Sequence, residues 1–367
     1  MPFFILAGNL MSSGGITQRI VKWAQTFVGH LRGGLAYVNI LACMLFGTVS
    51  GSAIAGTSAI GTLLIPSMKK EGYPASFCAG LTAVASTCCP VIPPSLAFVI
   101  YASAAKVSVS DMFVAGIVPG IIMGTLMLIL SHRYARKEDF PRTRKFTWRE
   151  RGAATVGVLP SLGIPAVIIG GIISGIFTPT EAAAIAVVYA LVLSFIYKTI
   201  TWKSLWNCII SSAIDSGAIM LIVGGCYLFG WVISNARITT ALATALVGLQ
   251  CGLWLKLLLI NSVLLIVGMF MDSSPAILLV APILAPAMAQ LGMDPIQTGM
   301  IICINLVIGL ATPPVGVCLY AATNISKVKF GETCRAALPF LGATLIALML
   351  ITYIPFITQI PFILLGR

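Results

Sequence analysis

Long apolar runs recur along this chain and limit its fold more than any other feature. Four of them are 113-FVAGIVPGIIMGTLMLIL-130, 153-AATVGVLPSLGIPAVIIGGIISG-175, 182-AAAIAVVYALVLSFIY-197 and 337-ALPFLGATLIALMLITYIPF-356. A helix needs about 17–25 such residues to cross the hydrocarbon core of a bilayer. Charged residues make up only 9% of the chain, whereas they make up about 25% of soluble domains. The sequence therefore predicts an all-α polytopic membrane protein.

The net charge of +12 is concentrated in one segment, residues 132–152. Eight Lys or Arg residues lie there against three acidic ones. A basic segment between two membrane spans is typical of a cytoplasmic loop. We prefer this interpretation to nucleic-acid binding.

No catalytic constellation is visible in the residues. The sequence has no cluster with metal-ligand spacing, no phosphate-binding Gly loop and no nucleophile–His pair. Its ten cysteines show no CxxC spacing and lie mostly in apolar runs, where Cys behaves as a small hydrophobic residue. The chain is therefore expected to be neither an enzyme nor a transition-metal protein.

The chain contains an internal repeat with an offset of 220 or 221 residues. Residues 47–74 resemble 268–295, and residues 88–120 resemble 308–340. Matched positions include Gly47 with Gly268, Pro93-Pro94 with Pro313-Pro314, and Pro119 with Pro339. Chance does not readily produce an ordered series of matches at one offset, so the two halves are expected to share a fold.

Basic residues at segment ends and the number of predicted membrane crossings give the two copies opposite orientations. Arg32 precedes segment 34–66 and Lys69-Lys70 follows it, so both ends of this segment are expected on the cytoplasmic side. The segment is therefore predicted to be a re-entrant helical hairpin. Five predicted crossings separate it from its counterpart at 257–289. An odd number of crossings inverts the second copy, which is the architecture of secondary transporters.

These arguments divide the chain into six parts. They are the end of a scaffold span with an interfacial arm helix (1–33); repeat 1 (34–120), with hairpin 34–66, broken span 77–105 and span 113–131; the basic cytoplasmic loop (132–152); scaffold spans and a second arm helix (153–256); repeat 2 (257–356), with hairpin 257–289, broken span 296–324 and span 337–356; and a C-terminal tail (357–367). The repeat matches the first residues to only the latter half of span 209–235, so the N-terminus is expected to be incomplete.

Each repeat is expected to contain two unwound places. One is a hairpin tip, 50-SGSAIAGTS-58 or 271-MDSSPA-276, and the other is a double-proline break, 89-CPVIPPS-95 or 309-GLATPPVG-316. Unwound backbone survives in a bilayer only inside protein or along a cavity. Carbonyl groups freed by proline and Ser/Thr hydroxyls are therefore expected to surround a small cation, while half-helix N-termini favour an anionic group. The alternative is that the prolines only kink the spans for packing.

Asp272, Glu181 and Asp215 are acidic residues within or beside apolar segments. Asp272 either contacts a cation or substrate, or caps the second arm of its hairpin through amides around Ser274 and Ala276. Glu181 fits a capping box that opens a helix. Asp215 receives no assignment from the sequence.

At these residues the chain resembles the large membrane subunit of tripartite ATP-independent periplasmic (TRAP) transporters. The resemblance is carried by 1-MPFFILAGNLM-11, 50-SGSAIAGTSAIGTLLIPSMKKEGY-73, 90-PVIPPS-95, 115-AGIVPG-120, 177-FTPTEAAAIAVVYAL-191, 271-MDSSPAILLVAPILAP-286 and 305-NLVIGLATPPVG-316. It implies Na⁺-driven uptake of an organic acid anion, such as a C4-dicarboxylate, sialic acid or sugar acid, by an elevator mechanism in the bacterial inner membrane. The implied partners are a small four-helix membrane subunit and a periplasmic substrate-binding protein.

Na⁺ sites in that family lie between each hairpin tip and the adjacent break. The resemblance implies a first cation site at Ser50, Gly51, Ser52, Pro90 and Pro93, and a second at Asp272, Ser273, Gly309, Thr312 and Pro313. Candidate substrate-binding residues are Ser52, Ser95, Ser274 and Asn305. Two departures from the family pattern, Ala53 at the first tip and Cys88-Cys89 before the first break, alter potential ligands of the first site.

Two other functions stay open at this point. One is a stand-alone Na⁺/dicarboxylate symporter that needs no binding protein, and the other is an inactive assembly subunit. The residues do not specify which organic acid is carried.

Overall fold

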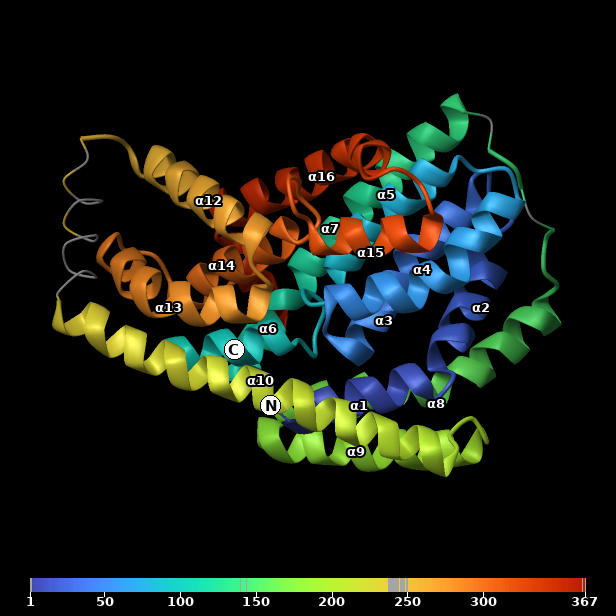
Figure 1. Cartoon of the computed structure of the whole chain (residues 1–367), viewed down its shortest axis with the longest axis horizontal. Helices are drawn as coiled ribbons and strands as arrows, with labels where there is room; N and C mark the ends of the chain where they lie inside the picture. The colour runs from blue at the N-terminus through green and yellow to red at the C-terminus, as the bar shows by residue number, and fades with distance from the viewer. Residues whose placement is uncertain are drawn as a thin grey trace.

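The computed structural model describes residues 2–236 and 250–364, except Asp139 and Thr143, together with Thr244, Gly248 and Gly366. These residues form helices and connections, and no strand occurs among them. In chain order the elements are α1 (Pro2–Ser13), α2 (Ile16–Val28), α3 (Gly34–Ser50), α4 (Ala53–Lys70), α5 (Ala75–Ala85), the 3₁₀ helix η1 (Ser86–Cys88), α6 (Leu96–Ala105), α7 (Val109–Lys137), α8 (Trp148–Ile173), α9 (Pro179–Ile196), α10 (Trp202–Asn235), α12 (Leu253–Phe270), α13 (Ser273–Gln290), α14 (Pro295–Gly309), α15 (Val317–Ser326), α16 (Phe330–Tyr353) and α17 (Phe356–Leu364) (Figure 1).

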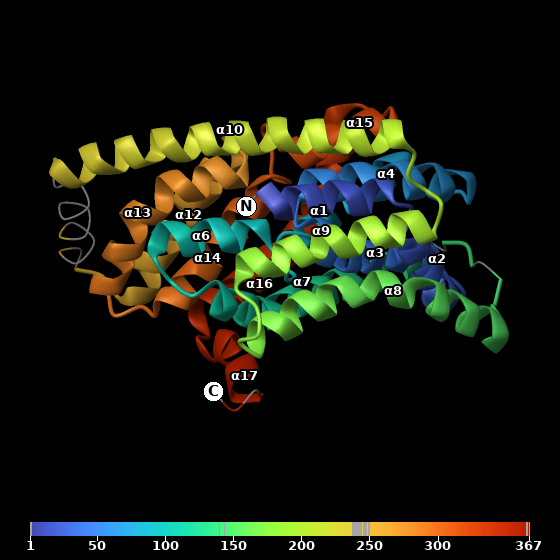
Figure 2. The same ribbon diagram turned by 90° about the horizontal axis from the view of Figure 1, so that it is seen from below.

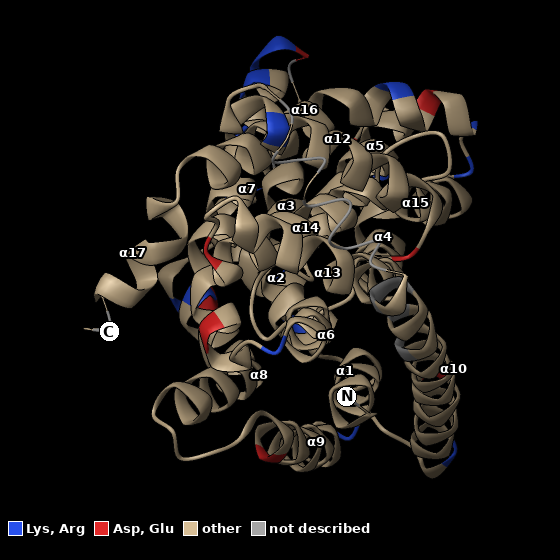
Figure 3. Ribbon diagram, turned by 90° about the vertical axis from the view of Figure 1, so that its left-hand side faces the viewer, with Lys and Arg blue, Asp and Glu red and all other residues tan. Residues whose placement is uncertain are grey.

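Seven of the described helices are long and apolar enough to cross a membrane: α7, α8, α9, α10, α12, α13 and α16. Lys and Arg lie mostly at helix ends and in loops, and the helices between them carry little charge (Figure 3). Large apolar side chains such as Leu159 on α8, Phe195 on α9 and Leu221 on α10 are exposed. A bilayer or a partner subunit would cover such surfaces. The chain is thus a multi-pass membrane protein.

Two helical hairpins enter the molecule from opposite sides. Helices α3 and α4 form the first, with Gly51-Ser52 as its tip, and α12 and α13 form the second, with Met271-Asp272 as its tip. In Figure 1 the first opens at the right and the second at the left, while their tips lie near the centre. The Lys69 Nζ atom donates to Ser326 O at 3.1 Å. This bond joins the end of α4 to the end of α15, so basic ends of both repeats lie on one side.

Each repeat also contains a helix that is broken in its middle. In repeat 1 the chain leaves helical structure after η1 and resumes it at α6, and in repeat 2 it does so between α14 and α15. The bonds Pro93-Pro94 and Pro313-Pro314 in these breaks are cis. Because proline has no N–H and clashes with the preceding turn, a helix does not run through such a pair.

The two repeats interlock about an internal two-fold arrangement. Helix α4 of the first hairpin packs on α15, and α13 of the second hairpin packs on α6. Swapping the two repeats converts one of these contacts into the other, and it likewise converts the contact of α5 with α16 into that of α14 with α7. Each hairpin therefore lies against the broken helices of both repeats. The predicted fold class is confirmed: an all-α membrane protein with inverted repeats, two re-entrant hairpins and two discontinuous helices.

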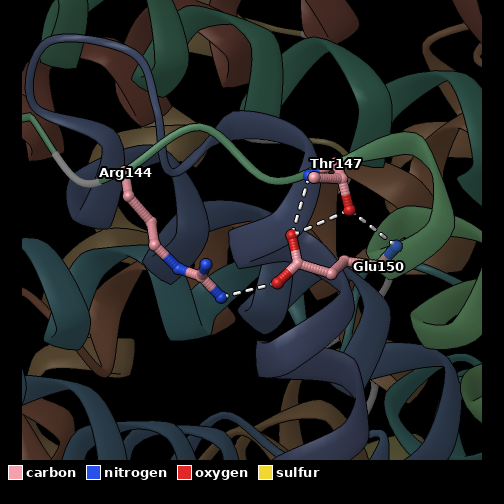
Figure 4. Close-up of polar contacts among 3 residues, drawn as sticks. All are labelled: Arg144, Thr147 and Glu150. Atoms are coloured by element: carbon pink, nitrogen blue, oxygen red, sulfur yellow. Dashed lines mark hydrogen bonds and ion pairs between the residues drawn. The ribbon is translucent and has the colours of Figure 1, made fainter.

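The basic loop is shorter than predicted. Helix α7 continues to Lys137 and α8 begins at Trp148, whereas the sequence predicted a loop over 132–152. A capping box starts α8 early, because Thr147 N donates to Glu150 Oε2 at 2.7 Å and Glu150 N donates to Thr147 Oγ1 at 3.3 Å. Arg144 Nη2 donates to the other carboxylate oxygen at 2.6 Å (Figure 4).

Other boundaries also differ from those predicted. Helix α4 continues past the predicted end at 66 to Lys70, and α12 begins at Leu253 rather than 257. Most of the predicted tail forms α17. Proline 355 ends α16, and Thr358 Oγ1 donates to Pro355 O at 2.8 Å as the new helix starts. The second arm helix, predicted over 237–252, lies largely outside the described residues.

Close backbone contacts place each hairpin against the break of its own repeat. A Cβ on Gly309 would lie 2.4 Å from the carbonyl carbon of Gly268, so α12 and α14 touch backbone to backbone. In repeat 1 a Cβ on Gly47 would lie 2.5 Å from Cys89 Cα. Only glycine allows such an approach. Cys89 is itself held in place, because its Sγ donates to Cys43 O at 3.1 Å.

Gly309→Ala is expected to lower the melting temperature of the detergent-purified protein. The added methyl group must push α12 and α14 apart, and overpacking of this kind costs about 1–3 kcal/mol. Gly342→Ala is the matched control, since nothing from a neighbouring element lies within 4 Å of its added Cβ and alanine favours a helix. Equal melting of Gly309→Ala and the wild type would contradict the close contact.

Candidate functional site

A cavity of about 520 Å³ lies where the two hairpin tips meet α1 and α10. Its volume falls in the range of small-molecule binding sites. Its polar lining comes from Asn9 and Ser12 on α1, Ser50 and Ser52 at the first tip, Asp215 on α10, and Asp272 and Ser274 at the second tip. Segments from both repeats thus contribute to one site.

The first tip is a tight turn that presents the N-terminus of α4. Gly51 has a φ of 60°, the left-handed conformation that commonly ends a helix at glycine. Ser52 is the N-cap of α4, and its Oγ accepts from Ala55 N at 3.4 Å. Ser50 Oγ accepts from Ser52 N at 3.3 Å. The tip is therefore stabilised by its own hydroxyl groups.

The first break lies directly beside this tip. A Cβ on Gly51 would lie 3.1 Å from Leu96 N and 3.4 Å from Pro94 O. Ser95 caps α6, because its Oγ accepts from Phe98 N at 3.3 Å. The same hydroxyl donates to Pro90 O. Since Pro94 and Leu96 both line the cavity, the N-terminus of α6 also opens onto it.

Asp272 forms the N-cap of α13 at the second tip. Its Oδ1 accepts from Ser273 N at 2.8 Å. The capping interpretation is confirmed, although the donor is Ser273 rather than an amide around Ser274 or Ala276. Asp272 is also exposed and lines the cavity, so capping leaves the carboxylate accessible to a bound ion.

The second break is set back from the cavity. Thr312 Oγ1 donates to Ile308 O at 2.8 Å. Gly309 is buried, while Thr312 and Pro313 are half-buried. None of these three predicted cation ligands belongs to the lining of the 520 Å³ cavity.

The cavity brings together only part of the predicted set. Ser50, Gly51, Ser52, Asp272 and Ser274 line it. Pro90, Pro93, Ser95 and Ser273 are buried and outside its lining.

Asn305, a substrate-binding candidate, also lies away from the cavity. It is completely buried. Its Nδ2 donates to Asn261 Oδ1 at 2.7 Å and to Asn261 O at 2.9 Å. This pair joins α14 to α12, so Asn305 holds the second hairpin to its broken helix.

Asp215 is a cavity residue that sequence reasoning left without a role. It lies on the same face of α10 as Ala218 and Ile222, which follow at i+3 and i+7 and line the same cavity. Helix α10 is joined to α1 where Asn9 Nδ2 donates to Ser212 Oγ at 2.9 Å. The available signal was a carboxylate within an apolar span, which by default indicates function.

The charges of the cavity are unusual for a site that takes anions. Two carboxylates, Asp215 and Asp272, line it, and within the described ranges no Lys, Arg or His side chain does so. The N-termini of α4, α6 and α13 open onto the same space through Ser52, Leu96 and Asp272. Carboxylate and hydroxyl oxygens suit a hard cation, whereas helix N-termini suit an anionic group. The site can therefore hold both.

Comparison with known proteins agrees with this architecture. Residues 1–357 match the family model described as tripartite ATP-independent periplasmic transporter, DctM component. The chain is 40% identical over 356 residues to the C4-dicarboxylate TRAP transporter large permease protein DctM of Pseudomonas aeruginosa, covering 97% of this chain and 83% of that protein. It is 36% identical over 368 residues to the sialic acid TRAP transporter large permease protein SiaM of Vibrio cholerae, covering 100% of this chain and 86% of that one.

A solved structure with a similar fold is the YdaH transporter of Alcanivorax borkumensis. The TM-score is 0.67 at 12% sequence identity, covering 97% of this chain and 85% of that chain. This likeness supports the fold alone. The family match and the two relatives go further: the chain belongs to the DctM family, the large permease subunits of TRAP transporters.

Proposed function

We propose that this permease carries an organic acid anion together with Na⁺ across the bacterial inner membrane. The relatives named above act on a C4-dicarboxylate and a sialic acid, and both substrates bear carboxylate groups. The proposed substrate class is therefore organic acids, including sugar acids. One observation carries the proposal: a single cavity is lined by both hairpin tips and by two carboxylates, with no basic side chain among its described lining residues.

The charge of the cavity favours transport of the anion together with cations. An anion that entered alone would meet the carboxylates of Asp215 and Asp272 without a balancing positive side chain among the described lining residues. Like charges about 8 Å apart repel by about 2 kcal/mol at an effective dielectric constant of about 20. Bound Na⁺ would remove this repulsion, so occupancy by the cation and by the substrate would depend on one another.

The helix N-termini supply the remaining attraction for the anion. The first amides of α4, α6 and α13 are incompletely paired within their helices and carry the positive ends of the helix dipoles. Ser52 and Ser274 place hydroxyl groups beside two of these ends. The substrate carboxylate would bind there, while Asp272 and the hydroxyls would face the cation.

The packing supports an elevator movement. The two hairpins and two broken helices interlock through the contacts of α4 with α15 and of α13 with α6. Helix α1 packs on α9 and α10, and α8 packs on α9 (Figure 2). The cavity lies between these two groups of helices. A shift of the interlocked group relative to the other would move the cavity without breaking the hairpin contacts.

The exposed apolar faces of α8, α9 and α10 are the proposed docking surface for a small four-helix membrane subunit. Leu159, Phe195 and Leu221 illustrate these faces. A periplasmic substrate-binding protein would deliver the anion to the complex. The cytoplasmic side would be the one that carries the basic connection between α7 and α8.

Na⁺ is expected to raise the melting temperature of the detergent-purified protein above its value in K⁺ at equal ionic strength. A ligand that binds only the folded state stabilises it by RT ln(1 + [L]/Kd), about 2.7 kcal/mol at a hundredfold excess over Kd. Ser52→Ala and Thr312→Val each remove a hydroxyl beside a candidate cation site and should reduce this Na⁺-specific rise.

Thr62→Val is the matched control for these two variants. It removes an exposed hydroxyl on α4 that donates to Ser58 O at 2.8 Å, away from the cavity. The Na⁺-specific rise should survive in this variant. Equal melting of the wild type in the two salts would contradict Na⁺ binding.

Asp272→Asn should weaken the apparent affinity for Na⁺ while leaving the fold intact. Asparagine caps a helix about as well as aspartate, so its amide oxygen can still accept from Ser273 N. A carboxylate within about 8 Å of a cation contributes about 2 kcal/mol, or roughly 30-fold in affinity, at an effective dielectric constant of about 20. The affinity is measured by titrating Na⁺ against melting temperature.

Glu181→Gln is the control for the loss of one negative charge. Glu181 Oε2 accepts from Thr178 N at 2.8 Å in an exposed capping box, outside the cavity lining. If the Asp272→Asn protein kept the wild-type affinity for Na⁺, Asp272 would not belong to the proposed cation site.

A further inference from the structure

A second cavity, of about 800 Å³, lies where the end of α7 meets the turn between α2 and α3. Arg32, Arg133, Arg136, Arg142 and His132 line it, together with Tyr37, Leu31, Leu128 and Ile129. No acidic side chain belongs to this lining in the described part of the chain. The cavity is therefore strongly basic, in contrast to the cavity at the hairpin tips.

The basic and apolar parts of this cavity are separated along the axis of α7. Leu128, His132 and Arg136 follow at intervals of four residues, and Ile129 and Arg133 form the adjacent row. One face of α7 thus changes from apolar to basic over about 12 Å of helix. Ile129 is 50% exposed and Leu31, across the cavity, is 44% exposed.

The depth of the cavity follows from this order. Helix α7 is one of the candidate membrane spans, and its last turn carries Arg136 and Lys137. A basic helix end marks the level of the cytoplasmic headgroups. The apolar end of the cavity consequently lies at the level of the acyl chains.

Aromatic packing fixes the segment that follows α7. Phe140 is buried, with its ring centroid 4.5 Å from that of Tyr73 and 5.0 Å from that of Phe77. Because Phe140 is anchored, Arg142 two residues later is held over the end of α7.

The turn between α2 and α3 is fixed against the same helix end. Gly33 N donates to Pro141 O at 3.2 Å. A Cβ on Gly33 would lie 2.4 Å from Ala135 Cβ, so glycine lets the turn press against α7. On the opposite wall Tyr37 Oη lies 2.8 Å from His132 Nδ1. The cavity walls are thus held together by contacts within the protein.

Three of the arginines that line this cavity have no partner among the described residues. Arg133, Arg136 and Arg142 make no hydrogen bond or ion pair with any residue that the structure describes. Arg144, two residues beyond the cavity lining, is by contrast bound to Glu150 at 2.6 Å (Figure 4). Three guanidinium groups therefore converge on one space without a counter-charge from the described residues.

We propose that this cavity binds the phosphate headgroup of an anionic phospholipid from the cytoplasmic leaflet. Guanidinium groups form bidentate hydrogen bonds with phosphate oxygens, and basic pockets between membrane helices on the cytoplasmic side suit anionic headgroups. The acyl chains would lie along Leu128, Ile129 and Leu31. This apolar part favours a lipid over a soluble phosphate, which would use only the arginines.

The test compares phosphatidylglycerol with phosphatidylcholine. Each lipid is titrated into the full chain in detergent, and apparent affinity is read from the rise in melting temperature. Phosphatidylglycerol should stabilise the wild type more than phosphatidylcholine does. Arg133→Gln/Arg136→Gln should weaken the phosphatidylglycerol affinity about 30-fold, since each basic residue near an anionic headgroup contributes about fivefold.

Lys145→Gln/Arg149→Gln is the matched control. It removes the same charge from the same basic segment, 132–152, at residues outside the cavity lining. It should leave the affinity unchanged. Equal losses in the two double variants would reduce the effect to general charge attraction and overturn the proposal. An equal response of the wild type to phosphatidylcholine would do the same. If inorganic phosphate stabilised the wild type as much as phosphatidylglycerol does, the ligand would be a soluble anion rather than a lipid. That result would also overturn the proposal.

The single variant Arg142→Gln carries the test if the double variant does not fold. Arg142 is exposed on the connection, so its replacement should not disturb packing. We expect about a fivefold loss of phosphatidylglycerol affinity. An unchanged affinity would overturn the proposal.

Discussion

Hydrocarbon offers no hydrogen-bond partner to an unpaired backbone group, and the rest of the structure depends on how this chain meets that constraint. Side chains stabilise three of the four unwound places: Ser52 and Asp272 cap the second arms of the hairpins, and Ser95 caps the helix after the first break. Close backbone contacts at Gly47 and Gly268 then shield the breaks with the hairpins. The protein can therefore keep helix ends inside a membrane, where they are available to ligands.

The same packing joins the two repeats into one unit. Each hairpin lies on the broken helix of the other repeat, so neither hairpin can leave without exposing a break. The N-termini of α4 and α13 consequently meet at one cavity, and α1 and α10 close its other side. In the proposed function, its negative lining would make a cation the natural partner of an anionic substrate. The basic cavity at the end of α7 lies away from this site and concerns the membrane rather than the cargo.

Much of the fold follows from patterns in the sequence. Prolines and glycines that recur at one offset predict the hairpins and the broken helices. The positions of basic residues and the odd number of crossings between the hairpins predict that the second copy is inverted. Capping boxes at Thr178 and Thr147 show where such reasoning succeeds and fails. The first was predicted, whereas the second, which shortens the basic loop, was not. At such helix ends a capping box favours an early start of the helix, whereas a run of basic residues favours a loop. A sequence alone does not show which of the two prevails.

The site was harder to predict than the fold. Ser95 and Asn305 are polar residues near a break, as substrate ligands would be. Both are buried, however, and their side chains form hydrogen bonds that hold helices in place. Asp215 belongs to no recognisable motif, and its position beside the tips is what assigns it to the cavity. Residue type and spacing identify which segments unwind. Tertiary packing decides which of their polar groups face the cavity.

The most direct test of the account measures whether the interlocked hairpins move as one body against the helices around them. Spin labels are placed on Thr62 of α4 with Val188 of α9, and on Thr62 with Asn324 of α15; all three positions are exposed. The partly exposed Cys226, Cys251 and Cys334 are first replaced by serine. An elevator movement coupled to Na⁺ predicts two populations of the Thr62–Val188 distance, in proportions that differ between NaCl and KCl, and one unchanged Thr62–Asn324 distance. A Thr62–Asn324 distance that varied while the Thr62–Val188 distance stayed fixed would contradict it.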